Sequence, residues 1–178
     1  MDSILDKIQQ NPNVPNRCYN TAVTSDIIFQ EIATNNSIIH TKSSIDTDMR
    51  DHIDYYCEYD NKKFTIDIKS AKKFLSDDYN YAKLLDDWIW IELKNVNGYN
   101  GWLFGKANYI VLVFLTELWF INRQELTKFI RNKVNMKYVM DKSEAMYNLY
   151  KRQYRNDLLT LIQLKDVKKE LNPKIFQK

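Results

Sequence analysis

The sequence predicts an α/β fold in which a mixed β-sheet is flanked by helices. Residues 52–69 read HIDYYCEYDNKKFTIDIK and alternate between apolar and polar side chains with the period of two that half-buried strands show. Residues 88–96 alternate in the same way, and the apolar run 109–115 suits a buried strand. Helical patterns precede, separate and follow these strands, which indicates a mixed α/β arrangement.

Residues 52–69 are predicted to form a β-hairpin. Asp60 and Asn61 lie between the two alternating runs, and both residue types tolerate the positive φ that a two-residue hairpin turn requires. A turn at this point pairs Tyr59 with Lys62 and produces one continuous apolar face. The cross-strand pairs on that face are Ile53 with Ile68, Tyr55 with Ile66 and Cys57 with Phe64.

The opposite face of the hairpin pairs Glu58 with Lys63 favourably, but it places Asp54 against Asp67. Two opposed carboxylates repel each other, so we expect a compensating partner, and a divalent cation is the simplest one. Lys69 projects to the same face. We therefore predict that Asp54, Asp67 and the Ile68 carbonyl bind Mg²⁺ or Mn²⁺, while Lys69 orients or deprotonates the attacking water or stabilises the charge that develops on a phosphodiester.

A third carboxylate is available on the preceding helix. Glu31 follows Ile27 and Ile28 by four and three residues, which places it on the apolar face. A carboxylate there is costly unless it is paired or bound to a metal, so Glu31 is predicted as a further metal ligand. The alternative is that Ile28 and Ile32 form the apolar stripe and Glu31 lies at its solvated margin.

The other elements follow from local signals. Pro12 and Pro15 interrupt an irregular start, and Thr24 or Ser25 caps the first core helix. The only three glycines of the chain lie within one loop, NGYNGWLFG. The predicted order is a helix over 24–34, a strand over 37–43, the hairpin, a helix over 71–86, strands over 88–96, 108–114 and 118–122, and helices from 123 onward.

Length and composition predict a single domain of residues 1–178, with a core over about 24–122 and a helical basic tail over 123–178. With 44% hydrophobic and 28% charged residues the chain reads as globular and soluble. It contains no apolar run of membrane-spanning length and no secretory signal at residues 1–10, so we expect a cytoplasmic protein, or one inside a host cell if it is viral. The composition, rich in Tyr, Lys and Asn, suits an AT-rich source such as a phage.

The charge distribution indicates a polyanionic partner for the tail. Residues 1–122 carry 12 Lys and Arg against 17 Asp and Glu, whereas residues 123–178 carry 14 against 6. Lys151, Arg152 and Arg155 form a predicted helical cluster beside tyrosines and are candidate nucleic-acid contacts. Solvated charges on a packed helix explain the same pattern equally well.

The glycine loop offers a second candidate nucleic-acid contact. Glycines allow the backbone to approach a phosphate closely, and Tyr99 and Trp102 could stack on bases, with Lys106 at a phosphate. The alternative is a structural turn in which Trp102 covers the sheet. Just before this loop, Glu92-Leu93-Lys94 repeats the acid-x-Lys pattern and competes with Asp67-Ile68-Lys69, but the following strand carries no acid to complete a metal site.

Glu31 on a helix, Asp54 on a strand and Asp67-Ile68-Lys69 on its hairpin partner resemble the motif set of the PD-(D/E)xK nuclease superfamily. The order of elements over about 24–115 is also similar to its αβββαβ core, and the spacing from Asp54 to Asp67 is similar to that of archaeal Holliday-junction resolvases and related phage nucleases. Ile53 replaces the proline of the motif. The resemblance implies a restriction-endonuclease-like fold, Mg²⁺-dependent cleavage of nucleic acid, Glu31, Asp54 and Asp67 at the metal, a catalytic Lys69 and, for resolvase-like relatives, a homodimer.

The leading hypothesis is therefore a metal-dependent nuclease that acts on DNA, with structure-selective endonuclease activity as one form and RNA as the other candidate substrate. The alternative is a catalytically inactive module of the same fold that binds nucleic acid or inhibits a partner protein. A third hypothesis is a structural or interaction protein whose paired aspartates are merely exposed at a sheet edge.

Overall fold

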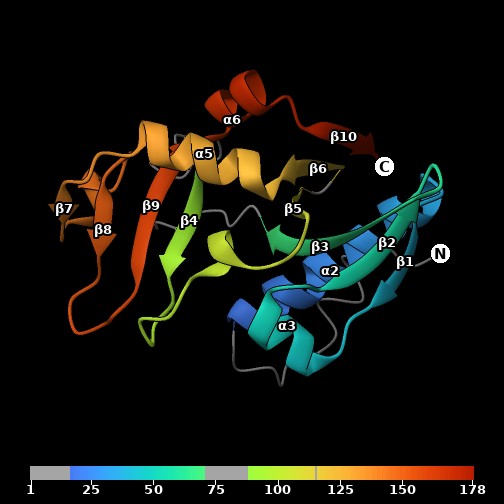
Figure 1. The fold of residues 1–178 in the computed structure, drawn as a ribbon, viewed down its shortest axis with the longest axis horizontal. Helices are drawn as coiled ribbons and strands as arrows, with labels where there is room; N and C mark the ends of the chain where they lie inside the picture. Colours follow the sequence, from blue (N-terminus) through green and yellow to red (C-terminus); the bar gives the residue numbers. More distant parts are fainter. Residues whose placement is uncertain (1–16, 71–87, 115) are drawn as a thin grey trace.

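The computed structural model describes residues 17–70, 88–114 and 116–178 and shows two β-sheets with helices packed around them (Figure 1). The chain is an α/β protein, as predicted. The helix predicted over 71–86 and the interrupted start over 1–16 lie outside the described residues, and for residues 17–23 only the backbone is described.

The larger sheet has six strands and mixed directions. All of its neighbouring strands are antiparallel except β3 and β5, which are parallel because the chain crosses over between them. In spatial order the strands are β1 (Ile39–Lys42), β2 (Tyr55–Tyr59), β3 (Lys62–Ser70), β5 (Tyr109–Val113), β6 (Glu117–Asn122) and β10 (Lys174–Gln177).

The hairpin of β2 and β3 has the predicted register. Tyr55 lies opposite Ile66, Cys57 opposite Phe64 and Tyr59 opposite Lys62. Asp60 and Asn61 have φ values of 52° and 58°, so both turn residues adopt the left-handed conformation that the turn requires. Alternation and turn chemistry together fixed this hairpin because both are local properties of the chain.

The smaller sheet differs from the sequence prediction. The strand predicted over 88–96 forms as β4 (Trp88–Lys94), but it does not join the hairpin. It pairs instead with a strand from the C-terminal part. Both faces of β4 are then covered: Ile89 and Ile91 lie in one apolar cluster, and Trp88 and Trp90 pack against another. In spatial order this sheet contains β4, β9 (Leu158–Gln163), β8 (Leu149–Lys151) and β7 (Tyr138–Val139).

The C-terminal part is not the helical tail that the sequence predicted. It contains two helices, α5 (Arg123–Lys133) and α6 (Leu164–Leu171), and a short 3-10 turn at Lys142–Glu144. The rest is mainly strands and loops: β7, β8 and β9 build the smaller sheet with β4, and β10 extends the larger sheet beyond β6. Helices were predicted from residue 123 onward, but pairing with distant strands determines the structure here.

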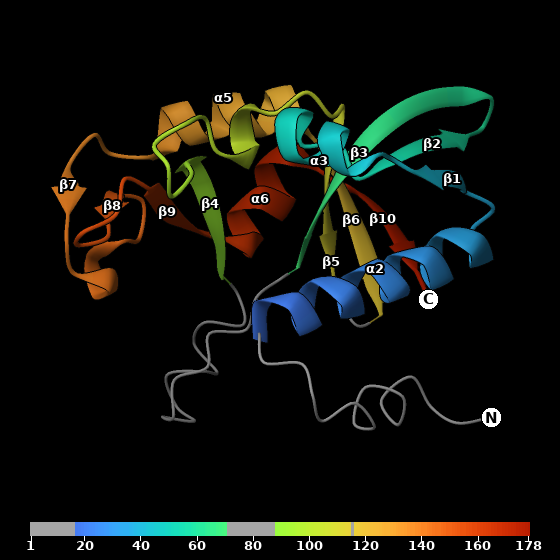
Figure 2. The same cartoon turned by 90° about the horizontal axis from the view of Figure 1, so that it is seen from below.

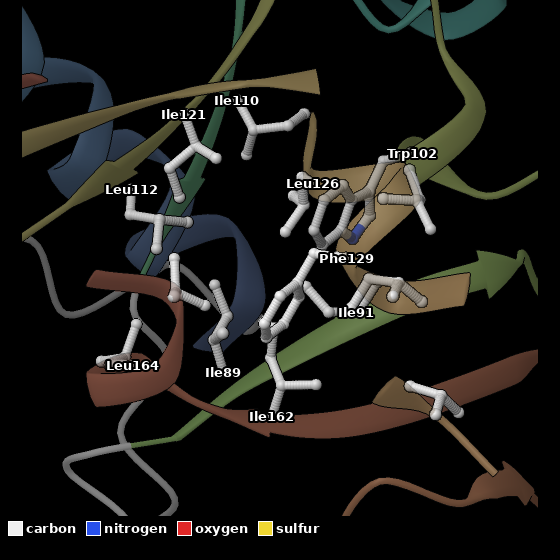
Figure 3. Close-up of a cluster of buried hydrophobic side chains, with 14 of the residues drawn as sticks. Ile89, Ile91, Trp102, Ile110, Leu112, Ile121, Leu126, Phe129, Ile162 and Leu164 are labelled. Atoms are coloured by element: carbon white, nitrogen blue, oxygen red, sulfur yellow. The ribbon is translucent and has the colours of Figure 1, made fainter. Parts of the chain in front are cut away.

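Helix α2 (Arg17–Asn35) covers one face of the larger sheet (Figure 2). Its buried residues Phe29 and Ile32 pack on Tyr55, Ile66 and other side chains of that face. On the opposite face, β5 and β6 form a second core with β4, β9 and α5, which Figure 3 shows. Ile110 and Ile121 enter this core from the larger sheet, and Ile91 enters it from the smaller one. The two sheets therefore share one hydrophobic layer.

Two short helical elements lie in the connections between strands. Helix α3 (Ile45–Asp51) connects β1 to β2, and Ser44 caps it by accepting a hydrogen bond from the Thr47 amide. A 3-10 turn, η1 (Trp102–Phe104), lies in the glycine loop between β4 and β5. Among the helices of the described ranges, none combines the length and the apolar character needed to cross a membrane.

Candidate active site

The candidate site lies where the β2–β3 hairpin meets α3. Asp54 precedes β2, and its backbone amide donates at 2.8 Å to the carbonyl of Ile66, the residue that pairs with Tyr55. Its side chain turns toward β3, and Oδ2 accepts a hydrogen bond from the Ile68 amide at 2.6 Å. Asp54 is therefore fixed beside Asp67 and Lys69 by backbone groups of the partner strand.

Asp67 is buried on β3, with 1% of its side chain exposed. Oδ1 forms an ion pair with Lys69, and Oδ2 lies 3.2 Å from Nη2 of Arg123. Burial raises the pKa of Asp67 to about 6, and the charge of Asp54 contributes, although Lys69 and Arg123 oppose the increase. The predicted collision of Asp54 with Asp67 therefore exists electrostatically, and two cations partly neutralise it.

Arg123, the first residue of α5, connects the site to the second layer. Its guanidinium is buried and, besides Asp67, donates to the backbone carbonyls of Trp102 and Ala107 and to that of His52 at 3.4 Å. Burial lowers the pKa of Arg123, and Asp67 opposes that change. Sequence reasoning missed Arg123, because its position 56 residues after Asp67 gives no local signal.

Asp48 on α3 is the third carboxylate of the site. It shares a hydrogen bond with Asp54, and its pKa rises to about 6 because of burial first and then the charge of Asp54. Lys69 opposes the increase and Asp67 adds to it, so all four groups act on one another. Sequence reasoning did not place Asp48 at the site. Prediction of the short helix capped by Ser44 would have placed it near Asp54.

Glu31, the third acid predicted from the sequence, does not join this group. Its Oε1 lies 3.0 Å from Nζ of Lys178, and the amide of Lys178 donates to the Thr116 carbonyl. Thr116 precedes β6, whereas Asp67 aligns through Ile110 with the other end of that strand. Ile28 and Ile32 are buried, whereas Ile27 is 40% exposed, which agrees with the alternative reading in which Glu31 lies at the margin of the apolar stripe. The position of Glu31 along α2 also directs it to the opposite end of the sheet.

His52 and Glu92 border the site from two sides. His52 ends α3 in the left-handed conformation, and burial, followed by the charges of Lys69 and Arg123, lowers its pKa. Glu92 on β4 accepts a hydrogen bond from the Trp102 backbone, and burial raises its pKa while Lys69 and His52 oppose the rise. The Glu92 triplet thus belongs to the smaller sheet and contributes its acid to the edge of the site.

The glycine loop packs against the site. A Cβ on Gly101 would lie 2.3 Å from the Glu92 carbonyl oxygen, and one on Gly105 would lie 2.5 Å from the His52 Cβ. Trp102 is buried, with its ring 5.7 Å from Nζ of Lys69. The indole therefore covers Lys69 and is not exposed for stacking on a base, which agrees with the alternative reading of this loop as structural.

The other predicted nucleic-acid contacts are dispersed. Tyr99 is 72% exposed at the tip of the glycine loop, and Lys106 lies 2.9 Å from Asp51. Lys151 is exposed at the end of β8, and Arg155 is exposed in the following turn. Arg152 forms an ion pair with the buried Asp157. These three basic residues do not form a helical cluster, because the chain there is a strand followed by a turn.

The donor chemistry of the site fits a hard divalent cation in part. Asp48, Asp54 and Asp67 supply carboxylate oxygens, the ligand type that Mg²⁺ prefers. The charge of Asp54 acts on Asp48, and a cation bound by both carboxylates would offset that repulsion. Asp67 already has Lys69 and Arg123 as partners. Among the residues that the structure describes, no group of three or more ligating side chains is spaced closely enough to hold a metal ion.

Comparisons with known proteins found no match to this chain. Neither the models of protein families, nor the curated proteins, nor the solved structures give a match to the chain. The fold and site therefore define an α/β protein with two sheets and a cluster of aspartates and one lysine at the end of a β-hairpin.

Proposed function

We propose that the protein is a metal-dependent nuclease that hydrolyses phosphodiester bonds of DNA, with Asp48, Asp54 and Asp67 as its acidic residues and Lys69 as its catalytic base or charge stabiliser. The observation that carries the proposal is the cluster of three aspartates around one lysine. Two of these acids have pKa values raised to about 6, and such perturbed groups concentrate at functional sites. The restriction-endonuclease-like core and the homodimer implied by the resemblance remain part of this proposal.

The topology of the hairpin region supports the proposal. A helix is followed by an antiparallel three-stranded unit, β1 to β3, and then by β5 parallel to β3, with the acids at one end of β2 and β3. This order is compatible with the nuclease core that the motif spacing resembles. Asp48 on α3 would take the place of Glu31 as the third acid.

The residues of the site have distinct tasks in such a reaction. Asp48 and Asp54 would hold the cation, which supplies Lewis-acid activation of the scissile phosphodiester. Lys69 would orient the attacking water or stabilise charge on the nonbridging oxygens, and its ion pair with Asp67 fixes its ammonium group. Arg123 would act as a positioning residue, because it holds Asp67 and does not face the solvent.

A second candidate function also has a specific observation in its favour. Asp67 is paired with two cations, so its charge is balanced without a metal. That balance suits an inactive module of the same fold that binds nucleic acid or a partner protein. The two candidates differ in metal binding and cleavage, which a single pair of variants can test.

Asp54→Asn is the most direct test of the nuclease. The asparagine carbonyl can still accept the hydrogen bond from the Ile68 amide, so we expect the fold to persist while cleavage of DNA with Mg²⁺ or Mn²⁺ falls at least about 100-fold. Asp60→Asn is the matched control, because Asp60 is an exposed acid in the turn of the same hairpin and asparagine tolerates its positive φ. Full cleavage by Asp54→Asn would overturn the proposal.

A further inference from the structure

The two halves of the larger sheet differ on the face that carries Asp67. Over β5 and β6 the buried residues Ile110, Leu112 and Ile121 pack into the shared core. Over β1 to β3 the same side of the sheet lines an open cavity of about 380 Å³. Its lining residues are Ile39, Thr41, Tyr56, Cys57, Glu58, Lys63, Phe64, Thr65 and Asn108.

This cavity lies on the face of the sheet that carries the Asp67 side chain. Tyr56 pairs with Thr65, and Thr65 precedes Asp67 by two residues on β3. The side chains of Tyr56 and Asp67 therefore project from the same face, about 7 Å apart along the strands. A ligand that crosses the aspartates along this face extends over Tyr56.

Tyr56 is the aromatic side chain that projects into the cavity from its floor. It is 48% exposed, between Thr41 on β1 and Thr65 on β3. A half-exposed ring between two short hydroxyl side chains leaves room for a second flat group above it. Base-to-aromatic stacking uses such a surface and tolerates any base.

The surroundings of the ring are polar. Arg50, 73% exposed, lies near Tyr56 and is held by Asp51 at 3.2 Å. Thr41 supplies a hydroxyl group to the cavity, and Thr65 and Asn108, which also line it, hydrogen-bond to each other. An added β-strand does not fit here, because the backbones of β1, β2 and β3 already pair with one another and the cavity lies on their face.

We propose that this cavity holds an unpaired nucleotide, with its base stacked on Tyr56 and its neighbouring phosphodiester at the aspartates. The inference rests on the proposed nuclease function and gives its substrate class: DNA with a single-stranded segment. A base inside a duplex is stacked and paired on both sides, so it cannot lie flat on Tyr56 unless it is first extruded.

Binding without metal tests the inference independently of cleavage. The full chain in EDTA is titrated against a fluorescein-labelled 15-nucleotide single strand and against the blunt duplex of the same sequence. We expect tighter binding of the single strand, and we expect Tyr56→Ala to weaken it by about 5- to 150-fold, the range that loss of one stacked base implies. Tyr56→Trp retains the affinity, and Tyr138→Ala, at an exposed tyrosine on β7, leaves it unchanged.

A fluorescent base separates stacking from a structural effect. In a single strand that carries 2-aminopurine at successive positions, one position is quenched by the wild type and by Tyr56→Trp but not by Tyr56→Ala. Wild-type affinity in Tyr56→Ala, or equal binding of duplex and single strand, would overturn the inference. Stacking as described without any Mg²⁺-dependent cleavage would retain the inference and reject the nuclease, whereas cleavage that is indifferent to Tyr56 would do the reverse.

Discussion

Nη2 of Arg123 lies 3.2 Å from Oδ2 of Asp67, and this contact joins the first residue of α5 to the hairpin that carries the candidate site. Both side chains are almost fully buried, with 7% and 1% exposed. The same guanidinium holds the backbone of the glycine loop through Trp102 and Ala107. One arginine therefore fixes the acid, the loop and the helix relative to one another.

Replacing Arg123 is expected to destabilise the fold strongly. Arg123→Met leaves Asp67 buried with Lys69 as its remaining cation, and removal of one partner of a buried pair costs about 3–5 kcal/mol. Urea unfolding followed by circular dichroism measures the change. Arg131→Met, at an exposed position of the same helix, is the control and should change the stability by less than about 0.5 kcal/mol.

The double variant Asp67→Asn/Arg123→Met separates charge from packing. If the buried carboxylate causes the loss, the double variant recovers part of the stability that Arg123→Met loses. A double variant that is no more stable than Arg123→Met would show that the guanidinium acts through the loop carbonyls alone.

Asp48 gives a pH dependence of stability with a defined sign. Its folded-state pKa of about 6 exceeds the unfolded value near 3.9, so the folded protein holds the proton more tightly and loses stability as the pH rises from about 4 to 6. Asp48→Asn removes this loss. The difference in unfolding free energy between Asp48→Asn and wild type should therefore be more favourable to the variant at pH 7 than at pH 4. We expect this change to be on the order of 1 kcal/mol, because solvent screens a partly exposed group.

Unfolding in urea at both pH values measures that difference. Asp46→Asn, an exposed acid on the same helix, is the matched control and should behave alike at the two pH values. If the stability of Asp48→Asn relative to wild type fell from pH 4 to pH 7, the sign of the Asp48 contribution would be the reverse of the one expected.

Metal binding should be visible as thermal stabilisation. A ligand that binds only the folded state at 100 times its Kd adds about 2.7 kcal/mol, so saturating Mg²⁺ or Mn²⁺ should raise the Tm of the wild type. Asp54→Asn should lose the shift and Asp60→Asn should keep it. No metal-dependent shift in the wild type would favour the inactive binding module.

Gly101 is required by close packing. A Cβ at this position would lie 2.3 Å from the Glu92 carbonyl oxygen and 2.8 Å from its Cγ, and strand backbone cannot yield. We expect Gly101→Ala to cost about 1–3 kcal/mol, as overpacking does, whereas Asn100→Ala next to it should be nearly neutral. Thermal unfolding of the two variants tests this, and equal Tm values would show that the loop can move away from β4.

The hairpin is the part of the fold that the sequence determined most fully. Period-two alternation and the Asp60-Asn61 turn specify which residues of β2 and β3 face each other. Asp54, directly before β2, is bonded through its side chain to β3 and lies near Asp67. The smaller sheet could not be predicted in the same way. More than 60 residues separate β4 from β9 in the sequence, and neither strand indicates its partner. Helices were also predicted from residue 123 onward, where the chain forms β7 to β10 besides two helices.

The candidate site was predicted in part for the same reason. Asp54, Asp67 and Lys69 lie together because they belong to one hairpin. Asp48 and Arg123 were missed because a turn of α3 and the start of α5 bring them there. Glu31 was misplaced because helical periodicity gives the face of α2 but not the end of the sheet that each turn reaches.

The central claim is that the aspartate cluster cleaves DNA, and a cleavage panel tests it most directly. End-labelled single-stranded, duplex and branched DNA and single-stranded RNA are incubated with wild type, Asp54→Asn and Asp60→Asn, with Mg²⁺, with Mn²⁺ and with EDTA. We expect metal-dependent cleavage of the DNAs that contain unpaired segments by wild type and Asp60→Asn, and none by Asp54→Asn. Intact substrates in every wild-type lane, or equal cleavage by Asp54→Asn, would contradict that claim.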